Sequence, residues 1–225
     1  MFNRISQRYD LLNRLLSARR DVVWRKKCAR LLPQRSGLRV LDLATGTADV
    51  AIALLKERPD IAITIGLDPA INMLKIGREK CKKTGANVDL INGDAQQLSL
   101  KSNSVDVITM AFGIRNVANI EAAFQEMFRV LTDRGRLIIL EFSLPTNRLI
   151  RLVYLFYFRT ILPFIGGLIS GDRQAYQYLN RTVEDFPYGQ AFCDKLAEAG
   201  FTETKALPLT FGIASIYSAE KRNDN

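Results

Sequence analysis

The chain has 225 residues, of which 48% are hydrophobic, and its mean hydropathy is close to zero. These values exclude a disordered protein and predict one globular domain with a substantial core. The chain contains no histidine, which excludes a Ser-His-Asp triad and nearly every zinc site, so we expect no metal centre. The formal net charge is +9, and residues 1–39 carry all of it, since they hold eleven Lys and Arg but two acids, and eleven minus two is nine.

Residues 1–37 are predicted to form a basic helical segment. Apolar side chains recur there at steps of three and four residues, with arginines between them, at Phe2, Ile5, Tyr9, Leu12 and Leu16. This spacing predicts an amphipathic helix, and a second short helix is expected over 21–32, around Trp24. The first helix either packs on the domain with its arginines in water, or lies on an anionic membrane or closes over a site.

The cysteines and the N-terminus indicate a cytoplasmic protein. Cys28, Cys81 and Cys193 show no paired spacing, which is typical of structural thiols in a reducing compartment. Residues 1–16 alternate apolar side chains with arginine, unlike the continuous apolar run of a signal peptide.

From residue 38 onward, predicted strands alternate with predicted helices. Strands are expected at 38–43, 62–67, 87–91, 104–111 and 135–142, with helices near 47–57, 70–83 and 119–131. A helix at 188–199 and strands near 201–207 and 210–218 follow, the last two as an antiparallel edge hairpin. The pattern predicts an α/β fold in which a mostly parallel, Rossmann-like sheet is covered on both faces. Ligands of such sheets bind beyond the carboxyl ends of the strands.

The first predicted strand, loop and helix have the form of a nucleoside-binding unit. The segment RVLDLATGTAD spans 39–49; its strand ends in Asp42, and its loop holds Gly46 between Thr45 and Thr47. Small residues there allow a ligand to approach the backbone closely.

Two further acids lie at the ends of predicted strands. Asp68 ends the second strand, and Asp94 follows the third. A carboxylate such as Asp68 can accept hydrogen bonds from both hydroxyls of a ribose, while Asp94 or the Ala95 amide can pair with the edge of an adenine. One such acid alone is more often a helix cap than a ligand, but three at successive strand ends favour a binding site.

The loop composition separates two classes of nucleotide-dependent enzyme. A nicotinamide dehydrogenase needs G-x-G-x-x-G, so that the backbone can approach a pyrophosphate, whereas this loop has Gly46 alone. Asp42 and Asp49 also bracket the loop with negative charge, which favours a ligand with cationic groups. S-adenosylmethionine carries an ammonium and a sulfonium, so the sequence favours a methyltransferase that uses this cofactor.

Nine segments carry a resemblance to a known family. They span nearly the whole chain, in the family's order: YDLLN (9–13), LDLATGTAD (41–49), GLDPAINML (66–74), GDAQQL (93–98), AFGIRNV (111–117), EMFRVL (126–131), LEFSLP (140–145), GDRQAYQYL (171–179) and AGF (199–201). On these segments the chain resembles the quinone-biosynthesis C-methyltransferases, which methylate demethylmenaquinone and, in some members, a ubiquinone precursor. The segments FGIRN and LEFS-x-P are much more specific than the cofactor loop.

The resemblance implies a fold, a reaction and a set of cofactor contacts. It implies a class I S-adenosylmethionine-dependent methyltransferase domain at 38–225, with an apolar insertion at 146–186, that converts demethylmenaquinol to menaquinol. It also implies cofactor contacts from Thr47, Asp68, Asp94 and Ala95, beside the Gly46 and Asp42 of the loop.

The chain departs from the family's pattern at three positions near the expected cofactor. Thr45 and Ala48 stand where glycines are usual, and Ala111 stands where a serine that contacts the cofactor is usual. The loop therefore has less backbone freedom than is typical of the family, and we expect no cofactor contact at Ala111.

Methylating a ring carbon of a quinol requires an oriented ring and a stabilised oxyanion. Arg115 and Asn116, just past the fourth strand, are candidates to stabilise that oxyanion, and Tyr9 is a candidate to move the hydroxyl proton. Two structural alternatives remain open at this point. Arg115 could instead pair with Glu126 or Glu141, and Tyr9 could belong to the core.

The segment 149–169 departs from the α/β rhythm. It is dense in Leu, Ile, Phe and Tyr, but the longest uncharged run in this region is 160–171, which is too short to span a membrane and is broken by Pro163. The segment is expected to form a small core of its own, an apolar wall for a prenyl tail, or a surface that dips into a bilayer.

The residues leave partners and two other functions open. The basic N-terminus permits an RNA methyltransferase, but AFGIRN stands where amino-methylating nucleic-acid enzymes have Asn/Asp-Pro-Pro-aromatic, so no nucleic-acid partner is expected. The substitutions at Thr45 and Ala48 keep a non-catalytic scaffold of quinone enzymes open. We expect a cytoplasmic protein held peripherally on the inner face of an anionic membrane, and a homodimer or a complex with other quinone enzymes remains open.

Overall fold

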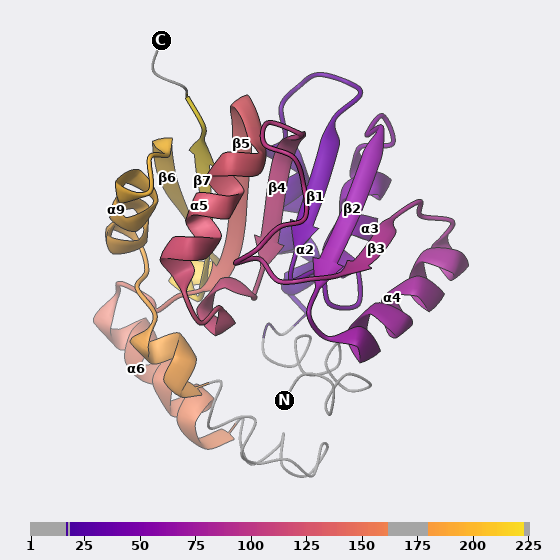
Figure 1. Cartoon of the computed structure of the whole chain (residues 1–225). Helices are drawn as coiled ribbons and strands as arrows, with labels where there is room; N and C mark the ends of the chain where they lie inside the picture. Colours follow the sequence, from indigo (N-terminus) through magenta and orange to yellow (C-terminus); the bar gives the residue numbers. More distant parts are fainter. Residues whose placement is uncertain (1–16, 18, 162–179, 223–225) are drawn as a thin grey trace.

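The computed structural model describes residues 17, 19–161 and 180–222, which form one seven-stranded sheet with helices on both faces (Figure 1). In chain order the elements are α2 (Asp21–Arg30), β1 (Arg39–Leu43), α3 (Asp49–Glu57), β2 (Ile63–Asp68), α4 (Ile71–Thr84), β3 (Asp89–Asn92), β4 (Val105–Ala111), η1 (Ile114–Asn116), α5 (Ile120–Val130), β5 (Leu131–Phe142), α6 (Arg148–Phe156), η2 (Tyr157–Ile161), α9 (Gln190–Glu198), β6 (Thr202–Leu209), η3 (Thr210–Gly212) and β7 (Ala214–Glu220).

The strand order is β3-β2-β1-β4-β5-β7-β6. The first five strands in this order are parallel, and β7 is antiparallel to both β5 and β6. The predicted fold is therefore confirmed: a Rossmann-like, mostly parallel sheet ends in an antiparallel hairpin. The chain reverses its direction of winding between β1 and β4, and a crevice opens at such a point at the carboxyl ends of the strands.

Two apolar clusters, one on each face of the sheet, hold the domain together. Helices α2 and α3 cover one face with Trp24 and Leu54, while α5 and α9 cover the other with Phe124 and Phe192, all buried. Strand β4 is buried along nearly its whole length, as expected for a central parallel strand with helices on both faces.

Two predicted strand boundaries are wrong for local reasons. Strand β7 begins at Ala214, not near residue 210, because Thr210 and Phe211 adopt left-handed backbone conformations (φ 44° and 60°) in the turn η3. Strand β5 begins at Leu131 rather than 135, directly after α5. Between the predicted helix near 119–131 and the predicted strand at 135–142, the chain forms an irregularity within β5, where Arg134 has a φ of 58°.

Helix α2 of the predicted N-terminal segment belongs to the core of the domain. Trp24 is 2% exposed, its Nε1 donates to Thr210 Oγ1 over 3.0 Å, and its ring lies against Phe112 and Phe142. The predicted first helix and Tyr9 lie outside the described residues.

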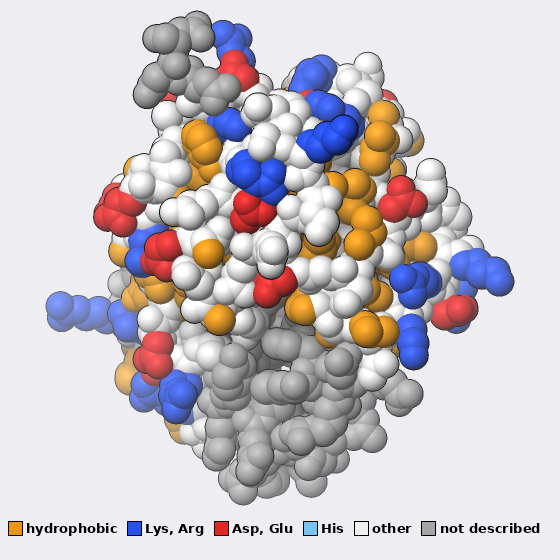
Figure 2. Space-filling model, viewed as in Figure 1, with side chains coloured by type: hydrophobic (Ala, Val, Ile, Leu, Met, Phe, Trp, Pro, Cys, Tyr) orange, Lys and Arg blue, Asp and Glu red, His pale blue; other side chains and the backbone are white. Residues whose placement is uncertain are grey.

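Part of the N-terminal positive charge is paired locally. Arg35 and Arg39 donate to the carboxylate of Asp106 at 2.8 and 3.0 Å, and these bonds hold the pKa of Asp106 down at about 2 although burial opposes the shift. On the face shown in Figure 2, Lys and Arg side chains are interspersed with acidic ones. The charges of Arg35 and Arg39 are therefore partly balanced within the domain.

The described part of the predicted insertion packs on the domain rather than on a core of its own. Tyr154 of α6 and Phe158 of η2 are buried in the same cluster as Trp24, with their rings stacked 5.2 Å apart. Within 17, 19–161 and 180–222, no helix has the length and apolar character needed to cross a membrane. Residues 162–179 lie outside the description.

The three cysteines are free thiols and all are buried. Burial raises the pKa of Cys28 to about 12, so this thiol stays protonated and unreactive. Their role in packing agrees with the prediction of structural thiols.

Candidate active site

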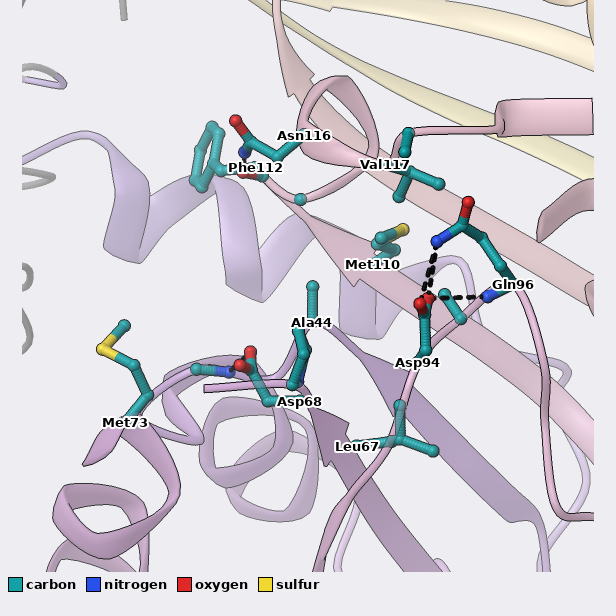
Figure 3. Close-up of a pocket in the computed structure, with 15 residues that line it drawn as sticks. Ala44, Leu67, Asp68, Met73, Asp94, Gln96, Met110, Phe112, Asn116 and Val117 are labelled. Atoms are coloured by element: carbon teal, nitrogen blue, oxygen red, sulfur yellow. Dashed lines mark hydrogen bonds between the residues drawn. The ribbon is translucent and has the colours of Figure 1, made fainter. Parts of the chain in front are cut away.

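A pocket of about 240 Å³ lies beyond the carboxyl ends of the neighbouring strands β1 and β4, where the strand order reverses (Figure 3). Its walls come from the loops after β1, β2, β3 and β4: Ala44, Gly46, Leu67, Asp68, Pro69, Met73, Asp94, Ala95, Gln96, Met110, Phe112, Gly113, Asn116, Val117 and Ala118. The described lining holds two acids and neither lysine nor arginine. Such a pocket suits a ligand with cationic groups.

The loop after β1 approaches the pocket through three left-handed residues. Ala44, Gly46 and Ala48 have φ values of 49°, 57° and 64°. Two of them are alanines, so the loop reaches by tertiary packing a conformation that glycine adopts without steric cost. Thr45, which stands where a glycine is usual, is buried, and its Oγ1 donates to Asp42 Oδ2 over 2.6 Å.

Asp42 lies beneath this loop and outside the pocket lining. It is completely buried and accepts a second hydrogen bond from Thr109 Oγ1, also over 2.6 Å. Burial raises the pKa of Asp42 to about 6, although the two hydroxyl donors oppose the shift. Its effect on a cofactor would therefore act through Thr45 and through the charge that it places under the loop.

Asp68, the last residue of β2, connects the first two loops at the pocket wall. Its Oδ2 accepts from the Gly46 N–H over 2.8 Å and its Oδ1 from the Ala70 N–H over 2.7 Å. Burial raises the pKa of this carboxyl, and the two backbone donors oppose that shift. Each oxygen keeps a further lone pair, and Figure 3 shows the carboxylate beside Ala44 and facing the pocket.

Thr47 turns away from the pocket into a chain of charged groups. Its Oγ1 accepts from Lys80 Nζ over 2.7 Å, and the same Nζ donates to Asp49 Oδ1 over 2.6 Å. The other oxygen of Asp49 accepts from Arg25, which also pairs with Asp21 at 2.9 Å. These contacts join α2, the start of α3 and α4 below the loop, so Asp49 is neutralised by two cations rather than directed at a ligand.

Asp94 and Ala95 form the pocket wall after β3. The carboxylate of Asp94 accepts hydrogen bonds from the backbone and the side-chain amide of Gln96 at 2.9–3.0 Å (Figure 3). Ala95 is 7% exposed, and apolar side chains of Leu67, Met110 and Val117 lie around the same part of the pocket. The arrangement combines a polar edge with apolar walls, as a flat heterocyclic base requires.

The turn after β4 closes the pocket on its other side. At Gly113, an added Cβ would lie 2.5 Å from Ala44 Cβ, so the loops after β1 and β4 approach each other closely there. Asn116 lines the pocket, and its Nδ2 lies 3.4 Å from the Phe112 carbonyl oxygen.

Arg115 forms the ion pair that the sequence left as an alternative. Its Nη1 lies 2.5 Å from Glu141 Oε1 and donates to the Phe112 carbonyl over 2.8 Å, while Glu126 pairs with Arg129 instead. Both members are buried, and Arg115 Nε and Glu141 Oε2 have no hydrogen-bond partner among the described residues. Burial raises the pKa of Glu141, which the charge of Arg115 opposes.

Several residues of the site were not predicted from the sequence. Gln96, Met73 and Phe112 line the pocket. The signal for Gln96 and Phe112 was their position after predicted strands, whereas Met73 lies in the first turn of α4 and had no such signal.

The family comparison gives the same result as the geometry. Residues 1–221 match the model of the ubiE/COQ5 methyltransferase family. This chain belongs to that family. The demethylmenaquinone methyltransferase of Thermus thermophilus is 45% identical over 221 residues, which are 98% of this chain and all of that protein. The ubiquinone/menaquinone biosynthesis C-methyltransferase UbiE of Geobacter sulfurreducens is 40% identical, over 98% of this chain and 87% of that protein.

Solved structures support the fold independently. A putative S-adenosylmethionine-dependent methyltransferase of Methanococcus maripaludis aligns with a TM-score of 0.69 at 17% identity, over 98% of this chain and 93% of that one. A second, from Thermotoga maritima and described as a possible histamine N-methyltransferase, aligns with a TM-score of 0.66 at 21% identity, over 98% of both chains. The class I methyltransferase fold is therefore confirmed, and the chain is a methyltransferase.

Proposed function

We propose that this methyltransferase transfers a methyl group from S-adenosylmethionine to a ring carbon of a prenylated quinol, converting demethylmenaquinol to menaquinol. The family and the names of the relatives support the reaction, and the acid-lined pocket supports a cationic cofactor. The observation that carries the proposal is that Asn116, next to Arg115, lies in the wall of the same pocket as Asp68 and Asp94. A cofactor site and a candidate oxyanion site therefore share one cavity.

The residues of the pocket fit the cofactor. When bound, S-adenosylmethionine supplies an electrophilic methyl group. Asp68 would hold the ribose hydroxyls with the lone pairs that its two backbone bonds leave over. Asp94 and the backbone of Ala95 would hold the adenine edge, and Gly46 allows the loop to approach the ligand. Thr47 and Asp42 would act indirectly, by holding the loop in place.

The quinol ring needs a group that stabilises its oxyanion. Deprotonating the ring hydroxyl pushes electron density onto the neighbouring carbon, and a donor near that oxygen stabilises the charge. The Asn116 amide in the pocket wall is the candidate donor, and the guanidinium of Arg115, which is paired with Glu141, donates to the same Phe112 carbonyl and holds the turn that carries Asn116. Tyr9 remains the candidate for proton transfer.

Two variants test these assignments. Asp68→Ala should lower cofactor affinity by at least about a hundredfold, because it removes two acceptor oxygens that carry charge. Replacing Arg115 alone would leave Glu141 buried and unpaired, so the second variant is Arg115→Gln/Glu141→Gln. It should keep cofactor affinity within about threefold of the native value and lower turnover by about a hundredfold.

The matched control is Arg136→Gln/Glu220→Gln, which removes an equally short ion pair, of 2.5 Å, from the strands β5 and β7 away from the pocket. It should change neither quantity. Calorimetry measures the cofactor affinity, and transfer of labelled methyl groups measures turnover. Equal losses of cofactor affinity in Asp68→Ala and Arg115→Gln/Glu141→Gln would contradict the role given to Arg115.

A peripheral position on the inner face of an anionic membrane follows from the same proposal. The quinol carries a prenyl tail that dissolves in the bilayer, so the pocket must receive its substrate from a lipid surface. The net charge of +9 supports attraction to anionic headgroups. Assembly as a homodimer or with other quinone enzymes is a further proposal, which light scattering of the pure protein and of a quinone-enzyme mixture would test.

Methylation of a ubiquinone precursor is the second candidate, because relatives named for both ubiquinone and menaquinone biosynthesis match nearly the whole chain. Offering both ring types at equal concentration would rank them by kcat/KM. Adding total RNA to the same mixture tests the remaining enzyme alternative, and label in RNA alone would contradict the quinol proposal.

A further inference from the structure

Helix α6 carries on its outer side a stripe of large apolar side chains exposed to solvent. Leu149, Leu152, Val153 and Phe156 are between 62% and 70% exposed. Their spacing of three and four residues places them on one face of the helix. The opposite face packs on the domain through the buried Tyr154. The helix is thus apolar on two faces, and only the inner one is covered by the domain.

Positive charge flanks this stripe on one side. Arg148 and Arg151 are exposed. At 100° per residue Arg148 lies at the edge of the stripe, and Arg151 lies farther round the helix on the same side, where its charge helps to lower the pKa of Glu184. Neither forms an ion pair with a described residue, and α6 contains no acid. An apolar face edged by arginines matches an anionic lipid surface, where apolar side chains enter the acyl boundary and guanidinium groups contact phosphates.

The stripe lies at the same end of the sheet as the pocket, beyond the carboxyl ends of the parallel strands. Helix α6 begins shortly after Phe142, the carboxyl end of β5, and Figure 1 shows it beyond the arrowheads of the parallel strands. Figure 2 shows basic, acidic and hydrophobic side chains together over the lower left of the molecule, where Figure 1 places α6 and the segment that begins at residue 180.

Another exposed apolar side chain lies at this end of the sheet. Phe211 is 76% exposed on the turn before β7, and Ala214 of β7 pairs with Phe142. Phe211 and Ile150 of α6 line one shallow groove together. The turn holds Phe211 in a left-handed conformation, with a φ of 60°, although neither burial nor a ring contact with another described residue accounts for this exposed position.

We propose that the outer face of α6, with Phe211, is the surface that docks this protein on an anionic lipid membrane. The proposal rests on the proposed function, because a prenylated quinol is presented from a bilayer. Docking through this face brings the carboxyl ends of the parallel strands, and with them the pocket, next to the lipid that holds the substrate.

Flotation of the full chain with vesicles tests the surface. The vesicles are phosphatidylcholine alone, or phosphatidylcholine with about 30% phosphatidylglycerol. Leu152→Ser/Phe156→Ser should lower binding to the anionic vesicles by about tenfold or more, through lost apolar burial. Arg148→Gln/Arg151→Gln should lower it by about tenfold, and the loss should shrink as salt is raised.

Matched controls separate the surface from general effects. Ile63→Ser removes an apolar side chain exposed at the amino end of β2, and Lys101→Gln/Arg134→Gln removes two exposed positive charges, one before β4 and one within β5. Both should bind like the native chain. Equal losses of vesicle binding in controls and α6 variants would overturn the proposal. A stripe variant that still floats with vesicles, but is monomeric by light scattering where the native chain is a dimer, would also overturn it, because the stripe would then be a dimer interface.

A water-soluble quinol with a truncated tail distinguishes failure of the docking surface from failure of the proposed function. The α6 variants should methylate this analogue as fast as the native chain and lose turnover only with the long-tailed quinol in vesicles. Native protein that floats with vesicles but methylates neither quinol would contradict the proposed function and leave the docking surface supported. Variants that methylate both quinols at the native rate would overturn the docking surface.

Discussion

At the scale of single residues, Asp42 shows how the cofactor loop is held at a cost in stability. Its carboxylate is completely buried, two threonine hydroxyls donate to it, and no cation forms an ion pair with it among the described residues. Its pKa of about 6 lies above the ordinary 3.8, because burial disfavours the charged form. At neutral pH the protein therefore keeps a buried negative charge directly below the loop.

This charge gives the folded state a pH dependence of known sign. Between pH 3.8 and about 6 the native state binds more protons at Asp42 than the unfolded state does, so the free energy of unfolding falls as pH rises through this window. In Asp42→Asn this contribution is absent. The free energy of unfolding of the variant minus that of the native chain should therefore be about 2–3 kcal/mol larger at pH 7.5 than at about pH 4.

Urea unfolding of both proteins at the two pH values measures this gain. Asp106→Asn serves as the comparison, because the pKa of that carboxyl is lowered to about 2 and its stabilising effect is lost only as pH falls through that value. A stability difference between Asp42→Asn and the native chain that is the same at both pH values would contradict the account.

At the scale of elements, the pocket depends on a close approach between the turn after β4 and the loop after β1. The space between Gly113 and Ala44 has no room for a second methyl group, and Ala44 itself has a left-handed φ of 49°. Gly113→Ala should therefore push the loops apart, lowering stability by about 1–3 kcal/mol and weakening cofactor binding. Thermal unfolding and calorimetry measure the two effects.

The rescue variant Ala44→Gly/Gly113→Ala removes the methyl group that would be struck. It should recover most of both losses, since glycine also adopts the left-handed conformation at position 44 without strain. Failure of the double variant to recover either property would show that the contact does not set the distance between the loops.

Also at this scale, the sequence predicted the elements better than the contacts between them. Periodicity placed Asp68 and Asp94 at strand ends, because apolar runs and turn residues report local structure. It did not predict that Thr47 turns to Lys80, and it left the partner of Arg115 open between Glu126 and Glu141, because such contacts join distant segments. Nor did it predict the left-handed Ala48, which lies close to Gly77 of the distant helix α4.

At the scale of the whole molecule, the candidate functional features of the described chain lie at one end of the sheet. The acid-lined pocket, the FGIRN turn and the exposed face of α6 all lie beyond the carboxyl ends of the parallel strands (Figure 1). The opposite end, at the amino ends of the parallel strands, carries connecting segments such as 31–38 and 58–62. This division is what an open parallel sheet provides, and it places the proposed cofactor site and the proposed docking surface at the same end of the sheet.

The most direct test of the central claim is the destination of the methyl group. The native protein is incubated with methyl-labelled S-adenosylmethionine, vesicles that contain reduced demethylmenaquinone, and total RNA, and the solvent extract is analysed by mass spectrometry. The account predicts label on a ring carbon of the quinol, and none with Asp68→Ala. Label on a quinol oxygen or in RNA alone, or no transfer by a protein that binds the cofactor, would contradict it.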